Sequence, residues 1–290
     1  MRSEQQMFDL ILTVARNDER VRAVTLEGSR TNPNVPKDMF QDYDIGFLVT
    51  EMDSYLNDPH WIDVFGERII MQMPEAMSMF PPELGRRFSY LMLFADGNRI
   101  DLTLIPLDEK EQYITEDKLL VVLLDKDGVL PPLPAPTDAD YRVKKPSPEW
   151  YADCCNEFWW VSTYVAKGLW RREILYAQEH LNRYVRPMLM KMLEWRVGFE
   201  TDFAVSIGKC GKYLERYLPP SRWRMLLETY PDGTYEGVWN ALFVMGDLFR
   251  TTAQEVALRL QTEYPLEEDR RVVRYLEQVR RLPRDAASIF

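Results

Sequence analysis

The sequence predicts an α+β protein in which a mixed β-sheet domain is followed by an all-helical domain. Three observations support this. Short β-rich runs fill residues 21–124, prolines crowd residues 131–148, and helical periodicity dominates the rest. The chain has 290 residues, enough for two ordinary domains, and 46% of them are hydrophobic, enough to build a core in each.

The first half begins with a helix and continues with six strands. Residues 3–17 place apolar side chains at helical spacing. The tripeptide Asp96-Gly97-Asn98 is typical of a hairpin turn. The expected strands are Val21–Leu26, Tyr43–Val49, Arg68–Met73, Phe88–Phe94, Arg99–Ile105 and Leu119–Leu124. These elements predict a mixed-sheet domain over residues 1–134.

The second half is predicted to be helical. Six prolines in residues 131–148 indicate a stiff, extended connection, with the linker proper at 135–148. The helical domain covers residues 149–290, and Pro187 is expected to kink or divide its second helix. The expected helices are 149–167, 171–196, 207–217, 220–229, 235–262 and 267–281.

Composition excludes several classes of protein. The net charge is −10, and residues 1–130 carry 13 Lys and Arg against 24 Asp and Glu, which disfavours a nucleic-acid partner. The longest aliphatic run, Leu119–Leu124, is too short to span a membrane. Three cysteines and no visible signal peptide favour a reducing, cytoplasmic location. No apolar stripe is left unassigned, so a monomer is expected.

The chemistry of the sequence is concentrated in the segments LEGSR at 26–30 and DYDIGF at 42–47. Gly28 permits close approach of the backbone to a phosphate, and the hydroxyl of Ser29 is a donor. Asp42 and Asp44 are two residues apart at the start of a strand, so both carboxylates point to one face. Hard oxygen ligands of this kind suit Mg²⁺.

A third carboxylate, Asp101, lies in the apolar alternating strand RIDLTL. An Asp in a strand interior is unusual and requires a partner. If this strand lies beside the strand of Asp44, three carboxylates converge, and such a set holds two Mg²⁺ ions roughly 4 Å apart for phosphoryl or nucleotidyl transfer. A plain turn followed by a solvated strand is the alternative interpretation.

These motifs resemble the polymerase-β-like nucleotidyltransferase superfamily. With NEFWWV and GKCGKYL from the helical half, the chain is similar over nearly its whole length to the aminoglycoside 6-adenylyltransferase family. The resemblance implies an ATP- and Mg²⁺-dependent enzyme that adenylylates the 6-hydroxyl of streptomycin, conferring resistance. It implies that Asp42, Asp44 and Asp101 are the catalytic residues and hold the metal, and that Gly28 and Ser29 contact the triphosphate.

The helical half offers candidates for binding a cationic acceptor. On helix 149–167, Asp153, Glu157 and Trp160 share a face, and two acids beside aromatic rings suit a guanidinium or ammonium group. Glu179 on the next helix is a further candidate. A solvated helix face is the alternative for all four residues. The acceptor is expected between the two domains.

Basic residues are candidates for binding the triphosphate. Lys209 and Lys212 lie three apart at the start of the helix predicted over 207–217, where two ammonium groups and a helix N-terminus favour anions. Arg30 follows the Gly28-Ser29 turn and is expected to assist. The GKCGK segment lacks the spacing of a P-loop.

Three other functions fit the sequence. One is a nucleotidyltransferase with a different acceptor, another is a non-catalytic ATP-binding regulator, and the third is a two-domain interaction protein. The residues alone do not distinguish ATP from GTP, and they leave the general base open among Asp101, Glu157 and Glu179.

Overall fold

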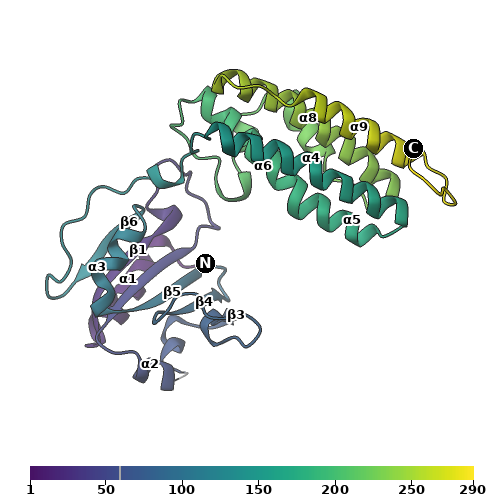
Figure 1. Cartoon of the computed structure of the whole chain (residues 1–290). Helices are drawn as coiled ribbons and strands as arrows, with labels where there is room; N and C mark the ends of the chain where they lie inside the picture. Colours follow the sequence, from purple (N-terminus) through teal and green to yellow (C-terminus); the bar gives the residue numbers. More distant parts are fainter. Residues whose placement is uncertain (59) are drawn as a thin grey trace. The chain divides into compact units, whose positions relative to one another are not determined.

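The computed structural model describes residues 1–58 and 60–290. The chain divides into two compact units, Met1–Asp140 and Tyr141–Phe290 (Figure 1). The first unit contains the sheet and the second contains helices without a strand in the part of the chain that is described. The expected α+β class is confirmed.

The first unit is built on one six-stranded sheet with the order β3-β4-β5-β2-β1-β6. Strands β2 and β5 are parallel, and the other neighbouring pairs are antiparallel, so the sheet is mixed as predicted. The strands are β1 (Val21–Glu27), β2 (Tyr43–Val49), β3 (Arg68–Gln72), β4 (Phe88–Phe94), β5 (Arg99–Pro106) and β6 (Leu120–Asp125).

One face of the sheet is buried beneath α1 (Glu4–Asn17). Ser3 forms a capping box with Gln6, which fixes where the helix begins. Met7, Ile11 and Ala15 are fully buried on the side that packs against the strands. Because side chains alternate along a strand, every second residue of the strands packs on this helix and the residues between them point to the opposite face of the sheet.

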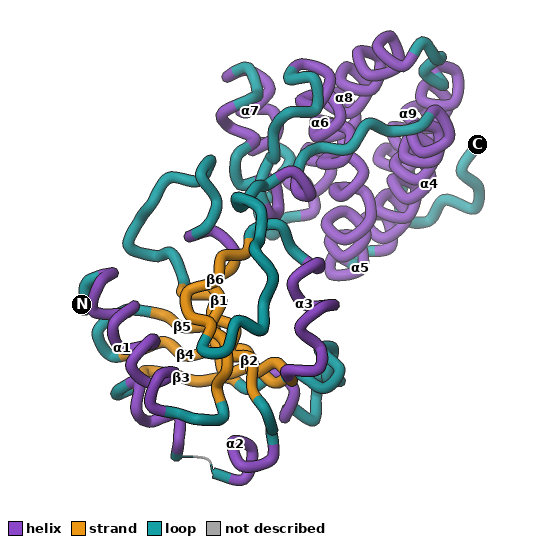
Figure 2. The backbone as a smooth tube through the Cα atoms, turned by 90° about the vertical axis from the view of Figure 1, so that its left-hand side faces the viewer, coloured by secondary structure: helices purple, strands orange, loops and turns teal. Residues whose placement is uncertain are grey.

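The opposite face is covered only in part. The short helix α3 (Lys110–Glu116) packs Tyr113 near Ala23, Leu48 and Ile105. Figure 2 shows α1 and α3 on different sides of the strands. Around the ends of β1, β2 and β5, this face carries the polar side chains described below, so the partial cover positions the candidate site.

The second unit is a bundle of helices. Its core includes Phe158 and Phe249, whose rings stack with centroids 3.8 Å apart, and Trp159, which meets both edge-on. The helices are α4 (Pro148–Arg171), α5 (Ile174–His180), α6 (Arg186–Glu200), α7 (Pro220–Glu228), α8 (Tyr235–Leu260) and α9 (Leu266–Arg281).

Of the helix predictions, one is confirmed in its division and one is wrong. The helix expected over 171–196 is divided, as predicted, into two α-helices joined by a π-helical turn, Leu181–Val185, and Pro187 lies in the first turn of α6, as its missing N–H favours. The helix expected over 207–217 is wrong: only the 3-10 turns Lys209–Gly211 and Leu214–Arg216 form there. The sequence analysis also missed α3 and the short helix α2 (Asp53–Asn57).

The Pro-rich segment between the units is anchored at both ends. Thr137 N–H donates to the carbonyl of Lys118 at 3.1 Å, and Asp138 accepts from Asn34 at 2.9 Å. Val143 N–H donates to the carbonyl of Val205 at 2.9 Å in the second unit. Among the helices of residues 1–58 and 60–290, none combines the length and apolar character that a membrane span requires.

Candidate active site

The strand register brings the predicted acids onto one face of the sheet. Asp44 on β2 is the direct partner of Asp101 on β5, and Asp42 lies two residues before Asp44. Direct partners in neighbouring strands share a face, as do residues two apart. The same row continues through both flanking strands: its members from β1 to β3 are Glu27, Asp44, Asp101, Leu91 and Gln72.

The acids repel one another, and the pKa of Asp44 is the most affected among them. Burial raises the pKa of the Asp44 carboxyl to about 7, and the negative charges of Asp101, Asp42 and Glu27 add to the rise. Burial also raises the pKa of Asp42. A carboxylate held among other carboxylates in a partly dry site favours a nearby cation.

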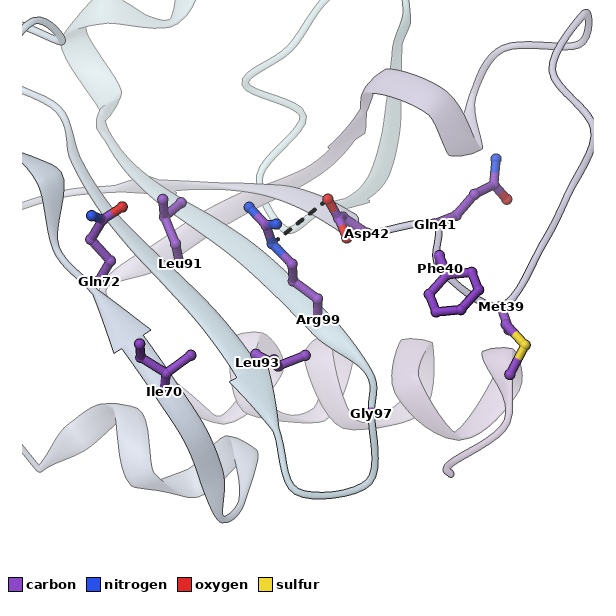
Figure 3. A pocket seen from close by; sticks show the side chains of 10 residues that line it. All are labelled: Met39, Phe40, Gln41, Asp42, Ile70, Gln72, Leu91, Leu93, Gly97 and Arg99. Atoms are coloured by element: carbon purple, nitrogen blue, oxygen red, sulfur yellow. Dashed lines mark ion pairs between the residues drawn. The ribbon is translucent and has the colours of Figure 1, made fainter. Parts of the chain in front are cut away.

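Arg99 supplies positive charge to this face. Its Nε donates to Asp101 Oδ1 at 2.8 Å and its Nη2 to Asp101 Oδ2 at 2.7 Å. Its Nε also lies 3.6 Å from Asp42 Oδ2, the ion pair drawn in Figure 3. The sequence analysis missed Arg99, although its position two residues before Asp101 in a strand places both side chains on one face.

Glu27 is a fourth acid that the sequence analysis missed. It is the β1 partner of Asp44, and its carboxylate accepts a hydrogen bond from the hydroxyl of Tyr113. Burial raises the pKa of Glu27. The signal in the sequence is its place directly before Gly28, at the end of a strand that is apolar or small from Ala23 to Leu26.

Gly28 turns the chain directly against Asp44. It begins the 3-10 turn Gly28–Arg30 with φ +70°, and a Cβ built on it would lie 2.5 Å from Asp44 Oδ2. Only glycine fits there without moving the carboxylate. The N–H of Gly28 donates to the carbonyl of Leu119 at 3.1 Å, whereas no partner of the Ser29 hydroxyl is found in the described chain.

Arg30 joins this turn to the start of β2. Its Nε donates to the carbonyl of Asp42 at 2.9 Å and its Nη2 to the carbonyl of Gln41 at 2.8 Å. The guanidinium stacks 3.7 Å from the ring centre of Tyr43, and the side chain is only 9% exposed. Gln41 in turn donates to the carbonyl of Ser29 at 3.3 Å. These contacts hold the turn and the acids in one frame.

The acids fit the requirements of a hard cation in their chemistry. Asp42, Asp44 and Asp101 are oxygen donors on one face, and burial together with the neighbouring negative charges raises the pKa of Asp44. In the arrangement recorded, Arg99 pairs with two of them, and no three acidic, histidine or cysteine side chains of residues 1–58 and 60–290 are gathered tightly enough for a metal centre.

The acceptor candidates lie on exposed faces of the helical unit. On α4, Asp153 and Trp160 are exposed and Glu157 is half-buried. Within the described chain neither Asp153 nor Glu157 forms an ion pair, so both charges are available to a ligand. Glu179 on α5 instead pairs with Arg183 at 3.2 Å.

Aromatic rings extend this face beyond Trp160. The Nε1 of Trp160 donates to the hydroxyl of Tyr164 at 3.0 Å, and the ring of Tyr164 meets that of His180 edge-on at 5.7 Å. Tyr176 and Tyr184 flank His180 at 4.0 and 5.4 Å between ring centres. The π-helical turn that carries Tyr184 is of a kind often found at functional sites. The sequence analysis missed the contribution of Tyr184.

The two candidate lysines lie on an irregular segment. Lys209 and Lys212 are exposed, and Lys212 Nζ lies 5.1 Å from the ring centre of Tyr213. Positive φ angles at Gly208, Cys210 and Gly211 keep this stretch from forming a helix. The expected helix N-terminus beneath the lysines is therefore absent from this described segment, and their charge alone remains as a reason to bind phosphate.

Comparison with known proteins gives a consistent family. The model of the streptomycin adenylyltransferase family matches residues 1–279. A Bacillus subtilis (strain 168) protein named aminoglycoside 6-adenylyltransferase is 48% identical over 280 residues, which cover 96% of this chain and 98% of that protein. A Campylobacter jejuni protein of the same name is 48% identical over 270 residues, covering 93% of each chain.

A solved structure is also similar in sequence. It is described as the crystal structure of an aminoglycoside 6-adenyltransferase from Bacillus subtilis, with 44% identity, coverage of 97% of this chain and 100% of that chain, and a TM-score of 0.48. The resemblance noted in the sequence is confirmed by the family match and by the identity to the relatives, as is the expectation of an enzyme. The chain therefore belongs to the streptomycin adenylyltransferase family and is an adenylyltransferase.

Proposed function

We propose that this enzyme transfers AMP from ATP to the 6-hydroxyl of streptomycin. In the balanced reaction the hydroxyl oxygen bonds to the α-phosphorus, the bond from that phosphorus to pyrophosphate breaks, and the hydroxyl proton is released. The names of the relatives support adenylyl transfer to an aminoglycoside. The observation that carries the proposal is the register pair of Asp44 and Asp101, with Gly28 packed directly against Asp44. Modification of the antibiotic would confer resistance.

Asp42, Asp44 and Asp101 would hold two Mg²⁺ ions. When bound, the metal neutralises charge on the triphosphate and on the attacking and leaving oxygens. The protein contributes a fixed row of oxygen donors, because Asp44 and Asp101 are held by the same strand pairing. Arg99 would exchange its contacts with Asp101 and Asp42 for contacts that accompany the bound nucleotide. Asp101, on the outer edge of the acidic row, is the proposed acceptor of the hydroxyl proton.

The triphosphate would lie over the turn that begins at Gly28. The hydroxyl of Ser29, which has no partner in the described chain, is a donor directly after Gly28, and Lys209 and Lys212 would supply positive charge. Arg30 has two donors committed to backbone carbonyls, so its role in nucleotide binding would be to hold the turn rather than to contact phosphate through those atoms.

Cationic groups of the acceptor would bind the helical unit. Asp153 and Glu157 have no ion-pair partner among the described residues, and Trp160 is an exposed aromatic side chain that would meet a guanidinium group. Streptomycin carries two such groups. Glu179 would join them after exchanging its partner Arg183, an exposed pair that costs little to separate.

We further propose that the enzyme works as a cytoplasmic monomer without a nucleic-acid partner. The three cysteines are free, which agrees with a reducing compartment. The net charge of −10 opposes binding to a phosphate backbone.

The test is pyrophosphate release from Mg-ATP with streptomycin, kanamycin, spectinomycin, lincomycin or no acceptor. Release with streptomycin alone is expected, and mass spectrometry of the product would identify the adenylylated hydroxyl. Release with another member of the panel would redirect the assignment of the acceptor. ATP binding with no release in any sample would favour a nucleotide-binding regulator.

A further inference from the structure

A pocket of about 470 Å³ lies beside the acids on the first unit (Figure 3). Asp42 and Arg99 form its polar edge. Gln41 and Gln72 also line it, and the remaining side chains are apolar, chiefly Phe40, Ile70, Leu91 and Leu93. An apolar floor with a few polar groups along one side is typical of a small-molecule site.

The pocket and the acids occupy the same face of the sheet. Leu91 on β4 is the direct partner of Asp101, and Leu93 is the direct partner of Arg99. Ile70 on β3 is in turn the partner of Leu93. The face therefore changes from acidic on β2 and β5 to mainly apolar on β4 and β3, where Gln72 is the polar member, within two strand spacings of about 4.8 Å each.

The apolar part of this pocket is unusually open to solvent. Phe40 is 83% exposed, Met39 is 65% exposed and Ile70 is 65% exposed. Grouped apolar side chains of this size on a surface mark a place where another molecule binds. The charged side chains of Asp42 and Arg99 along one edge and the apolar side chains on the floor favour a ligand with polar groups at its rim and an apolar face.

The direction of the reaction decides which substrate enters the pocket. Nucleotidyl transfer is an in-line displacement, with the attacking oxygen opposite the leaving pyrophosphate. The strand order β1-β2-β5-β4-β3 places the Gly28 turn on one side of Asp44 and Asp101 and the pocket on the other. With pyrophosphate leaving toward the turn, the attacking hydroxyl approaches from β4 and β3.

We propose that this pocket binds the ring of the aminoglycoside that carries the reacting hydroxyl. The carbon face of the ring packs on Leu91, Leu93 and Ile70, with Phe40 at the opposite wall, and its hydroxyl edge faces the acids. The proposal rests on the proposed function, because it takes the Gly28 turn as the triphosphate site and an aminoglycoside as acceptor.

The test fills the pocket and compares the two substrates. Ile70→Trp places a large ring over the floor, and Ile69→Trp is its matched control. Ile69 is the preceding residue, is 64% exposed and does not line the pocket. For the unmodified chain and each variant, calorimetry gives the dissociation constants for streptomycin and for α,β-methylene-ATP with Mg²⁺, and pyrophosphate release gives KM for streptomycin.

Ile70→Trp is expected to raise the dissociation constant and KM for streptomycin about tenfold or more, since filling a pocket removes the packing of a whole ring. Ile69→Trp should leave both values within about twofold, and both variants should bind the nucleotide analogue normally. Unchanged streptomycin binding in Ile70→Trp would overturn the proposal. So would weaker nucleotide binding in that variant, which would assign the pocket to the nucleoside.

A second variant guards against misfolding. Phe40→Ala removes the most exposed wall of the pocket without touching the core, and it is expected to weaken streptomycin binding about threefold to tenfold with unchanged thermal stability. An unmodified chain that binds and adenylylates streptomycin while both variants match it would refute the pocket and leave the function intact. An unmodified chain that neither binds nor adenylylates any aminoglycoside would refute both.

Discussion

Gly28 leaves no room for a side chain against Asp44: a Cβ on Gly28 would lie 2.5 Å from Asp44 Oδ2. The turn proposed to hold the triphosphate and the acid proposed to hold the metal are thus in direct contact. A substitution in the turn is therefore expected to move the Asp44 carboxylate, and the proposed sites for triphosphate and metal are coupled.

Gly28→Ala is expected to lower kcat/KM about 100-fold, because the added methyl group displaces the Asp44 carboxylate and a misplacement of about 1 Å at a reacting centre is enough for such a loss. The φ of +70° adds a backbone cost of about 1 kcal/mol. Gly128→Ala is the control, since Gly128 has φ +65° and nothing within 4 Å of a built Cβ. Equal losses of activity in both variants would show that backbone strain, not Asp44, is responsible.

Asp44→Asn is expected to lower kcat about 100-fold or more while making the folded chain more stable. The raised pKa of Asp44 means that its ionised form opposes folding at pH 8, and removing that charge should add about 1 to 3 kcal/mol to the free energy of unfolding. Urea unfolding in EDTA and steady-state kinetics check the two effects. A fully active Asp44→Asn enzyme would remove Asp44 from the site.

Arg30→Lys is expected to raise KM for ATP about tenfold, because a lysine keeps the charge but cannot span the carbonyls of Asp42 and Gln41. Lys37→Ala is the control. Lys37, like Arg30, forms an ion pair with Glu4, but in the described chain it makes no hydrogen bond to the carbonyls of Asp42 and Gln41. Similar KM values for Arg30→Lys and the unmodified enzyme would mean that the Gly28–Arg30 turn keeps its position without the hydrogen bonds of the Arg30 side chain.

Glu157→Gln is expected to raise KM for streptomycin about tenfold, the loss of one charge-assisted hydrogen bond, with KM for ATP unchanged. Glu228→Gln, an exposed acid on α7 of the same unit, serves as the control for general loss of negative charge. Equal changes in the two KM values would exclude Glu157 from the acceptor site.

Asp96 should make stability depend on pH at the acidic end. Arg2 donates from its side chain and its backbone N–H to Asp96, and these bonds hold the pKa of the carboxyl below its ordinary value of 3.8. A lowered folded-state pKa stabilises the fold above that ordinary value, and the contribution is lost as pH falls below it. Asp96→Asn is therefore expected to cost about 1 to 2 kcal/mol at neutral pH.

Urea unfolding of the unmodified chain and of Asp96→Asn at about pH 7 and about pH 3 measures the difference between their free energies of unfolding, which should shrink at the lower pH. Asp108→Asn is the comparison, because Asp108 pairs with Arg86 on the exposed surface at 2.8 Å, where a salt bridge contributes little. A difference for Asp96→Asn that grows on acidification would contradict the sign of the effect.

Local pattern was enough to predict much of the sheet unit. Alternation of apolar and polar residues gave the strands that carry Asp44 and Asp101, and an acid inside an apolar strand is conspicuous because it needs a partner. That the two strands are neighbours was only a condition in the sequence analysis, since residues 57 positions apart carry no local information about pairing.

The rest required contacts that a sequence does not display. Arg30 follows the turn proposed to bind phosphate, yet its Nε and Nη2 donate to the carbonyls of Asp42 and Gln41, which the fold of the intervening loop places beside it. The segment around Lys209 looked helical by composition, but backbone angles at Gly208, Cys210 and Gly211 break it into turns. Two of these residues are glycines, which favour helices only weakly. The sequence-based prediction of a helix gave more weight to their apolar and basic neighbours.

The parallel pairing of β2 with β5 has a consequence for how genes of this kind can vary. The chain between Val49 and Arg99 leaves β2, forms β3 and β4, and returns, so insertions in its loops change only the length of the return path. A single-residue deletion inside β5 before Asp101 is different, because it turns that carboxylate to the face beneath α1. Length variation should therefore collect in the loops and spare the strands.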